Sequence, residues 1–467
     1  MLNSLLVPTG CTMGTLRLLS VTEKFKALIT WAERSPVRAL AALWLVLAIV
    51  VSTGDALTGS TRRDFTSYSL AAARTMYQGG NPYSREDAKT SYKYLPLNAT
   101  LLWPFTRMPV ALAQGMWTAT NVVLLAVCLW AHRRLWAHEL CVPWWVWAVA
   151  LAVGLRFFVK NIRLGQWNTS VYCLSFLGLT VLYRGRAWLG GALLALAAAL
   201  KYMPSFFVVL LGLERRWRAM AIVVLAYVGW VFVLPTIVHG PSRHLELLAL
   251  YRQKAAKSYN HMLDGDYTSS LSLRSTVMRL TSPIKSRLPN PDAYDFTIVL
   301  LPKATARLLS EAVALVVFLA TVGASWYILR RQASLRAESR PESASFDNPL
   351  GAMQQLLLIG LWYTMLLMIS PETRTPHFLT LFTPAFALSL VLANWRWHAA
   401  RRALVALLLG AATVFLLATA EISEKARYHL IASGLGAYAW AQVAMWLACL
   451  FALSVVSQVP RDSDGKE

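Results

Sequence analysis

The stretch Ala312–Tyr327, which reads AVALVVFLATVGASWY, decides the fold class of this chain. With its apolar flanks it is long enough to cross the hydrocarbon core of a bilayer as one helix. Runs of the same kind recur along the chain, for example at Leu40–Thr53 and Ala403–Ala418. Of the 467 residues 57% are hydrophobic and only 15% are charged, against about 25% in a soluble domain. We therefore expect an all-α, polytopic bundle of transmembrane helices.

The positions of lysine and arginine predict about twelve spans, because cytoplasmic loops are enriched in these residues. We expect a cytoplasmic or interfacial segment at 1–38, the transmembrane bundle at 39–456 and a cytoplasmic tail at 457–467. Two long outer loops are expected at about 59–109 and 238–308. Ten spans are predicted near 39–58, 110–131, 142–158, 167–183, 219–237, 309–329, 351–369, 377–393, 402–420 and 436–456.

The two remaining helices are expected to form a short hairpin between the basic clusters 184–186 and 214–218. A single long span between these clusters would place one of them on the outer side of the membrane. Lys201 and Pro204 lie midway between them. Because proline breaks a helix and a charge needs a polar environment, we expect two short helices that meet at these residues.

The net charge of +22 does not indicate nucleic acid in this chain. Much of the basic charge lies in short loops, where it sets topology and contacts anionic head groups, so membrane lipids are the expected partners. His132 and His398 fall on the inner side, where we interpret them as topology or interface residues. The five cysteines show no CxxC spacing, and no metal cluster, Walker loop or nucleotide fingerprint occurs. Neither a cofactor nor a metal is expected.

Asp64 is the most informative polar residue. It follows Arg62 and Arg63 at the outer end of the first predicted span, and an amphipathic stretch with apolar residues at helical spacing comes after it. Two interpretations remain open at this point. The carboxylate could cap this surface helix, because aspartate is a favoured N-cap residue. It could also act as a general base that takes a proton from a hydroxyl group.

Other polar residues lie at the same predicted face. Arg163 and Lys201 each lie beside an apolar span, and both could clamp phosphate oxygens. Glu372 and His377 lie in a short turn between two spans. Glu372 is a second candidate carboxylate. His377 could hold a sugar hydroxyl, assist a base or cap the next helix.

Four segments together resemble integral-membrane glycosyltransferases of the GT-C type. The match is to the polyprenol-phosphate-mannose-dependent mannosyltransferases of glycosyltransferase family eighty-seven, over about residues 40–390. The segments are Asp64 to Pro104 with its Asn-Pro-Tyr and Tyr-Leu-Pro-Leu motifs, Arg-Leu-Gly-Gln-Trp-Asn at 163–168, Gly190 to Pro204, and Ser370 to His377. Ser269 to Arg274 is similar to an outer-loop Ser-Leu element. Where the family often has Ser-Trp with Asp or His, this chain has Glu-Thr-Arg-Thr-Pro at 372–376.

The resemblance implies a donor that carries its sugar, mannose first of all, on a polyprenyl phosphate. The acceptor would be an envelope lipid or glycan, reached from the extracytoplasmic (periplasmic) side of the inner (plasma) membrane. Asp64 would be the catalytic base, with inversion at the anomeric carbon, and an arginine or lysine would stabilise the departing phosphate. The implied substrate-binding residues are Arg63, Tyr68, Tyr83, Tyr94, Arg163, Gln166, Asn168, Lys201, Glu372 and His377.

Two other functions are compatible with a polytopic bundle. A lipid or sugar transporter or flippase of the envelope should show inverted repeats and charges at mid-membrane. A non-catalytic assembly subunit is the third interpretation. The polar residues of this chain gather at one face beside two long loops, which favours the enzyme.

Overall fold

The fold is that of a computed structural model. It describes residues 50, 54, 64–84, 92–137, 140, 142–263, 270–282, 296–338, 349–394, 399–419, 431–433 and 435–456. Every regular element within these ranges is helical. The predicted segment 1–38, nearly all of the span at 39–58, Arg63, His398 and the tail lie outside the described residues.

Eight helical segments are long and apolar enough to cross a membrane, which confirms the all-α, polytopic fold class for the described part of the chain. Each of the eight overlaps one predicted span, and the ends differ from the predicted ones by up to six residues. Three shorter apolar helical segments add to them. The long elements are α7 (Val110–Ala131) continued by η2 (His132–Trp136), α8 (Trp144–Leu164), α12 (Trp217–Val228) continued by η4 (Gly229–Val233) and α13 (Leu234–His239), α16 (Lys303–Glu338), α17 (Pro349–Ile369), η6 (Thr375–Leu381) continued by α18 (Phe382–Asn394), α19 (Ala399–Ala418) and α21 (Ala437–Val456).

The predicted hairpin is present. Helix α9 (Asn168–Tyr183) is followed by α10 (Ala187–Leu200), and Lys201 then takes an extended conformation that ends α10. The 3₁₀ helix η3 (Met203–Phe206) starts with Pro204 in its first turn, and α11 (Phe207–Leu213) completes the hairpin. Pro204 suits the first turn of a helix, where a missing N–H costs nothing. The chain therefore reverses at Lys201, as expected from the sequence.

The first predicted outer loop is largely helical. The π-helix η1 (Phe65–Leu70) and α3 (Ala71–Tyr77) form the predicted amphipathic stretch, with Phe65, Ala72 and Met76 buried. Gly79, with φ of +83°, lies just beyond its end. Two short helices, α5 (Pro96–Leu101) and α6 (Trp103–Thr106), follow.

The second predicted outer loop is not a loop throughout. It contains α14 (Pro241–Leu263) and α15 (Leu273–Thr281). Ser272 caps α15 by accepting a hydrogen bond from the backbone N–H of Ser275. The mixed composition of this stretch concealed the helices from a search for apolar spans.

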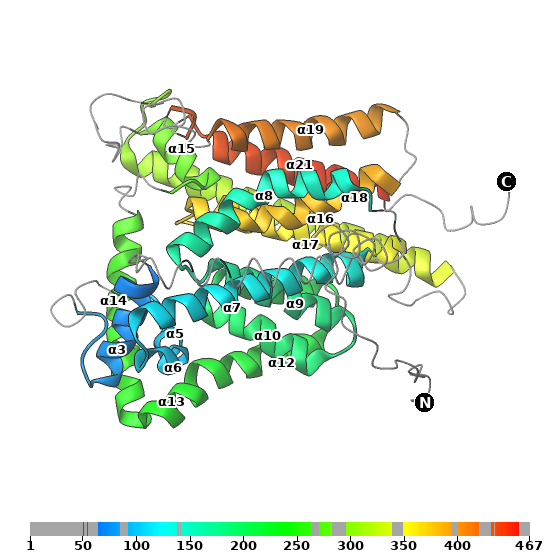
Figure 1. Cartoon of the computed structure of the whole chain (residues 1–467). Helices are drawn as coiled ribbons and strands as arrows, with labels where there is room; N and C mark the ends of the chain where they lie inside the picture. Colours follow the sequence, from blue (N-terminus) through cyan, green and yellow to red (C-terminus); the bar gives the residue numbers. More distant parts are fainter. Residues whose placement is uncertain are drawn as a thin grey trace, which may run out of the picture.

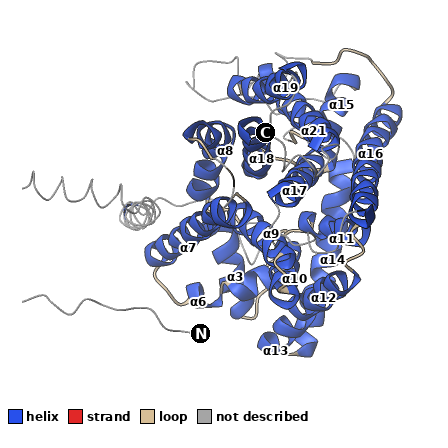
Figure 2. Ribbon diagram, turned by 90° about the vertical axis from the view of Figure 1, so that its right-hand side faces the viewer, coloured by secondary structure: helices blue, strands red, loops and turns tan. Residues whose placement is uncertain are grey.

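The long helices lie side by side, with α3, α5, α14 and α15 at one end, on the left of Figure 1. Figure 2 looks nearly along the helix axes and shows α17 in the interior, where it packs against α16, α18 and α21. We call the end with α3 and α14 the Asp64 end. His132 is wholly buried, stacked on Phe176 with ring centroids 3.8 Å apart. The interpretation of His132 as a topology or interface residue was therefore wrong.

Candidate functional site

Asp64 lies at the N-cap position of η1, but its side chain makes no hydrogen bond to that helix. The backbone carbonyl of Asp64 begins the helix instead, by accepting from the N–H of Ser69 at 3.0 Å. The Oδ2 atom of Asp64 accepts a hydrogen bond from Nε2 of Gln166. The capping interpretation is thus wrong, and the carboxylate is directed at the start of α9.

Gly165 allows this approach. It ends α8 in the left-handed conformation, with φ of +66°, which glycine adopts without strain. A Cβ at this position would lie 2.6 Å from Cβ of Phe65, the residue after Asp64. The carbonyl of Gly165 also accepts from the indole N–H of Trp117 at 3.0 Å, and the ring of Trp117 stacks on Phe65. Gly165 therefore sets the distance between Asp64 and Gln166.

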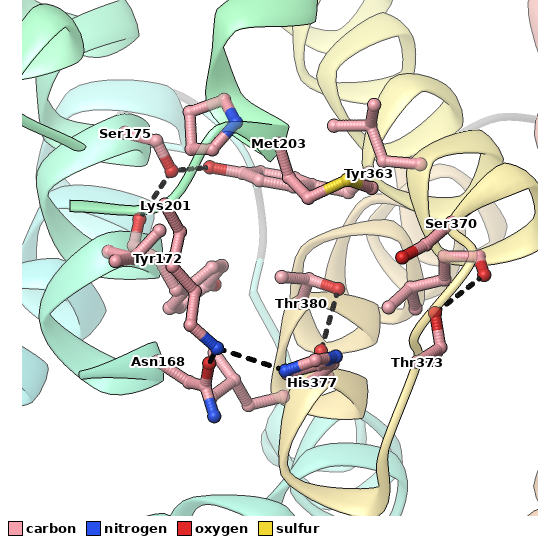
Figure 3. Close-up of a pocket in the computed structure, with 15 residues that line it drawn as sticks. Asn168, Tyr172, Ser175, Lys201, Met203, Tyr363, Ser370, Thr373, His377 and Thr380 are labelled. Carbon is pink, nitrogen blue, oxygen red and sulfur yellow. Dashed lines mark hydrogen bonds between the residues drawn. The ribbon is translucent and has the colours of Figure 1, made fainter. Parts of the chain in front are cut away.

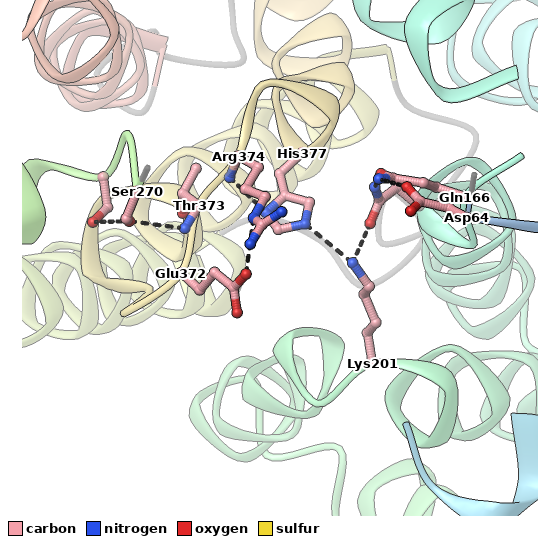
Figure 4. Close-up of polar contacts among 10 residues, drawn as sticks. Asp64, Gln166, Lys201, Ser270, Glu372, Thr373, Arg374 and His377 are labelled. Atoms are coloured by element: carbon pink, nitrogen blue, oxygen red, sulfur yellow. Dashed lines mark hydrogen bonds and ion pairs between the residues drawn. The ribbon is translucent and has the colours of Figure 1, made fainter. Parts of the chain in front are cut away.

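A chain of side-chain hydrogen bonds runs from Asp64 to His377 (Figure 4). Nδ2 of Asn168 donates to Oε1 of Gln166 at 2.6 Å, and Nζ of Lys201 donates to Oδ1 of Asn168. The same Nζ lies 3.0 Å from Nε2 of His377. Four separate elements thus meet at this chain: the start of η1, the α8–α9 connection, the hairpin turn and η6.

Asn161 anchors this chain of hydrogen bonds to the helix bundle. It lies in α8 and is buried, and its Nδ2 donates to the carbonyls of Phe157 and Pro376. Its Oδ1 accepts from Nδ2 of Asn168 at 2.9 Å. Asn161 therefore ties the α9 end to the turn that carries His377. The sequence analysis did not single out Asn161, because a buried amide leaves no pattern of its own.

The turn before η6 is held from behind. Thr373 is wholly buried, its N–H donates to Oγ of Ser270 at 3.1 Å, and its carbonyl accepts from the N–H of Leu271 at 2.6 Å. Glu372 and Arg374, on either side of Thr373, form an ion pair of 2.9 Å that is partly exposed. This pair lies beside His377 in Figure 4. The Ser-Leu element thus supports the turn and does not itself enter the chain.

Burial has the largest effect on the pKa values of the side chains along these hydrogen bonds. Burial lowers the pKa of Lys201 to about 8, while Glu372 and Asp64 act in the opposite direction. Burial raises the pKa of Tyr68, and the neighbouring Tyr94, Glu372 and Asp64 raise it further. A lysine with a lowered pKa and a buried tyrosine beside a carboxylate are typical of a functional site.

Several tyrosines pack beside the chain. The ring of Tyr94 lies 5.8 Å from Nζ of Lys201, and Oη of Tyr83 donates to the carbonyl of Tyr94 at 3.0 Å. Tyr92 is wholly buried among Tyr68, Tyr83 and Tyr94, and its Oη has no hydrogen-bond partner within the described part of the chain. Tyr92 was not predicted as a site residue, although it lies two residues before Tyr94.

A cavity of about 80 Å³ extends from Lys201 and His377 between α9, η3 and α17 (Figure 3). It has room for a few water-sized groups. Deeper in, Oγ of Ser175 lies 2.7 Å from Oη of Tyr363. The lining residues are Asn168, Val171, Tyr172, Ser175, Lys201, Met203, Pro204, Tyr363, Leu366, Leu367, Ser370, Thr373, His377, Leu379 and Thr380.

The structure joins five of the predicted residues through consecutive hydrogen bonds: Asp64, Gln166, Asn168, Lys201 and His377. Tyr68, Tyr83, Tyr94 and Glu372 lie around it. Arg163 is exposed on the last turn of α8 and is not among the residues that line the cavity. Arg63 lies outside the described residues. Within those residues, no three His, Cys, Asp or Glu side chains lie close enough to share a metal ion.

Comparison with known proteins identifies one family. The model of glycosyltransferase family 87 matches residues 92–344. A curated relative from Mycobacterium tuberculosis (strain CDC 1551 / Oshkosh) is 24% identical over 253 residues, in an alignment that covers 51% of this chain and 57% of the relative. It is described as a polyprenol-phosphate-mannose-dependent alpha-(1-2)-phosphatidylinositol pentamannoside mannosyltransferase. The match thus spans a little over half of that relative's length. No solved structure matches this chain.

The family match confirms the resemblance seen in the sequence. It includes Tyr94, Gln166, Asn168 and Lys201 and ends before His377, and it begins after Asp64. The part of the site that lies outside the matched range is therefore connected to the rest by the tertiary contacts described above.

Proposed function

The chain belongs to glycosyltransferase family 87, and from this membership and the geometry of the site we propose that it transfers a sugar from a polyprenyl-phosphate donor to a glycolipid or glycan acceptor. Mannose is the first candidate for the sugar, because the matched relative is named for a polyprenol-phosphate-mannose donor. The single observation that carries the proposal is the hydrogen-bond chain that holds the carboxylate of Asp64 and the side-chain nitrogen of Lys201 in one site, with Lys201 beside the cavity.

Asp64 is proposed as the general base. Its Oδ2 is held by Gln166, and within the described residues its Oδ1 has no hydrogen-bond partner and is available to an acceptor hydroxyl. The acceptor oxygen bonds to the anomeric carbon as the bond from that carbon to the phosphate oxygen breaks. The electron pair leaves with the phosphate, and the hydroxyl proton goes to Asp64. A single displacement of this kind inverts the anomeric configuration.

Lys201 is proposed to receive the departing phosphate. The bond that breaks adds one negative charge to the phosphate group, and the side chain of Lys201, as an ammonium beside the bound donor, stabilises that charge. Lys201 lies at the cavity, next to His377. Hydrogen bonds to Asn168 and to the backbone N–H of Arg374 hold the side chains of Lys201 and His377, respectively. The apolar part of the cavity wall, with Val171, Met203 and Leu366, suits the adjoining lipid.

The test of the base is transfer by Asp64→Asn in proteoliposomes that contain polyprenyl-phosphate mannose and extracted envelope lipids. We expect a loss of about 10³-fold, within the range for a general base. Glu246→Gln is the matched control, because it removes one carboxylate from an exposed ion pair on α14 at the same end of the bundle. Transfer by Asp64→Asn within about tenfold of that control, a loss below the roughly 10²-fold lower limit of such effects, would contradict the assignment.

The donor and the stereochemistry are tested on the wild-type protein. Polyprenyl-phosphate mannose, polyprenyl-phosphate glucose and nucleotide sugars are offered one at a time. Transfer from a nucleotide sugar alone contradicts the donor class. The anomeric configuration of the product, measured by NMR, should be opposite to that of the donor, and a retained configuration contradicts the single displacement.

The site is proposed to face the extracytoplasmic side. Basic loops support this orientation, because the turns at 184–186 and 214–216 lie at the other ends of the helices that lead to Lys201. Ser67 is exposed on η1, three residues from Asp64. In a protein whose native cysteines have been replaced, Ser67→Cys should react with a membrane-impermeant maleimide in intact cells. Labelling only after the cells are opened would reverse the orientation.

A further inference from the structure

The hydrogen bonds of the site determine where its protons lie, because backbone groups orient both ends of the chain. At one end, Nδ2 of Asn161 donates to the carbonyls of Phe157 at 2.8 Å and Pro376 at 2.6 Å. A carbonyl can only accept, so the nitrogen of Asn161 is identified and both its hydrogens are used. Its Oδ1 must then be the atom that faces Asn168, and Nδ2 of Asn168 donates to it.

The orientation passes along the chain from there. With its nitrogen towards Asn161 and Gln166, Asn168 presents Oδ1 to Lys201. Gln166 accepts with Oε1 and therefore presents Nε2 to Asp64. Reversing either amide would bring two donors or two acceptors together. The three hydrogen bonds that join Lys201 to Asp64 through Asn168 and Gln166 all point towards the carboxylate.

The other end is set by Arg374, whose backbone N–H donates to Nδ1 of His377 at 3.2 Å. A neutral imidazole that accepts at Nδ1 carries its hydrogen on Nε2. That hydrogen faces Nζ of Lys201 at 3.0 Å and needs an acceptor. An ammonium has no lone pair, whereas a neutral amine has one. Lys201 in this arrangement is therefore a neutral amine that accepts from His377 and donates to Asn168.

We infer that Gln166 and Asn168 are positioning residues that join Asp64 to a neutral Lys201 through a chain running in one direction, and that Lys201 takes up one proton from solvent when a phosphate binds beside it. The identity of the anion rests on the proposed function. Once Lys201 is an ammonium it no longer accepts from His377, and the Nε2–H of that ring is left for an oxygen of the bound anion. Release of the phosphate reverses both changes.

The surroundings of Lys201 agree with a neutral resting state above about pH 8. Burial has the largest effect on its pKa, which it lowers, and Arg374 and Lys93 lower it further. Glu372 and Asp64 raise it, and the ring of Tyr94 lies 5.8 Å from Nζ. With a pKa of about 8, the amine is mostly neutral at pH 9, so uptake of a proton is measurable there.

The resting state can be tested without any substrate. Trace acetylation of the purified full chain by acetic anhydride, followed by peptide mass spectrometry, reports the neutral fraction of Lys201 at each pH. We expect a midpoint near pH 8. Asn168→Asp places a carboxylate against Lys201 and should raise the midpoint by about one unit or more. Asn394→Asp, at the far end of the η6–α18 segment, should leave it unchanged. A wild-type midpoint near 10.4, the ordinary lysine value, overturns the inference.

Phosphate-coupled uptake is tested with farnesyl phosphate, a short polyprenyl monophosphate, at about pH 9. This ligand is fully ionised there, since its second pKa is about 6, so any proton taken up belongs to the protein. Calorimetry in two buffers of different ionisation enthalpy should show uptake of close to one proton by the wild type and much less by Asn168→Asp. Binding without uptake overturns the coupling. An acetylation midpoint near 8 that farnesyl phosphate leaves unmoved contradicts the phosphate assignment, and with it the coupling, but keeps the resting arrangement.

The positioning role has its own measurement. Gln166→Met keeps the length of the side chain but removes the hydrogen bond that orients the carboxylate of Asp64. The kcat for transfer should fall by about 10²-fold, as for a catalytic group that is slightly misplaced, while the KM for the donor stays unchanged. A rise in KM for the donor with kcat unchanged would indicate a merely structural role and contradict the inference.

Discussion

Substitution of Gly165 by alanine should separate Asp64 from its partner without removing any functional group. The substitution has two costs. A left-handed conformation costs a residue with a Cβ about 1–2 kcal/mol. The new Cβ would also lie 2.6 Å from Cβ of Phe65, a contact that must open to about 3.4 Å or more. Phe65 is buried between Trp117 and Phe105, so overpacking adds about 1–3 kcal/mol.

The displacement is passed on to the site because Asp64 precedes Phe65 directly. A shift of nearly 1 Å between η1 and the α8–α9 connection breaks the contact between Asp64 and Gln166. Misplacement of this size costs about 10²-fold in rate. We therefore expect Gly165→Ala to lower kcat for sugar transfer about 10²-fold and to destabilise the protein by roughly 2–5 kcal/mol.

Gly185→Ala is the matched control. Gly185 has φ of +82°, so alanine has the same kind of backbone strain there, but a Cβ would meet nothing within 4 Å. It lies in the turn between α9 and α10, at the end of the bundle away from Asp64. Transfer rates in proteoliposomes and thermal unfolding in detergent are compared for the two variants. If Gly165→Ala keeps a transfer rate within about threefold of Gly185→Ala, the contact with Phe65 does not position the base.

Three further outcomes follow from the structure. Since the ammonium of Lys201 is needed to bind the phosphate, kcat/KM for the donor should fall as pH rises through about 8. The free protein should gain stability between about pH 8 and 10.5, because in this range the unfolded chain binds a proton that the folded protein does not. Lys201→Met should remove both effects. Gly190→Ala should lower the thermal stability of the α9–α10 hairpin, because its Cβ would lie 2.6 Å from the carbonyl oxygen of Gly178; full stability of this variant in a melting experiment would contradict the close crossing. Ser270→Ala removes the acceptor of the Thr373 N–H and should raise KM by about three- to tenfold with a modest stability loss of about 1–3 kcal/mol, whereas an unchanged KM would show that the turn holds its shape alone.

The membrane class and most of the helices could be predicted because apolar runs and basic loops are local features. The hairpin at Lys201 was also predictable, since a proline and a lysine at the middle of an apolar segment leave few arrangements. The helices α14 and α15 were missed because their stability comes from packing at the Asp64 end, and their composition resembles a hydrophilic loop.

The site was predicted only in part. Resemblance to a known family supplied the candidate residues, and spacing alone favoured a helix cap for Asp64. The choice among the cations could not be made locally. Arg163 and Lys201 have equally suggestive surroundings in the sequence, yet Lys201 contacts His377 and Arg163 is exposed.

The sequence by itself determined that this chain is a helical membrane protein, where most of its apolar helices lie and which family it belongs to, because hydropathy, charge and motifs act over short stretches of chain. Only the tertiary structure decided which side chains share a site. Asp64 and Gln166 are 102 residues apart, and Lys201 and His377 are 176 apart. Such contacts depend on how α8, α9, α10 and η6 pack, on a glycine that lets Phe65 approach, and on backbone carbonyls that orient buried amides. The direction of the proton chain, and with it the neutral state of Lys201, is a property of that packing.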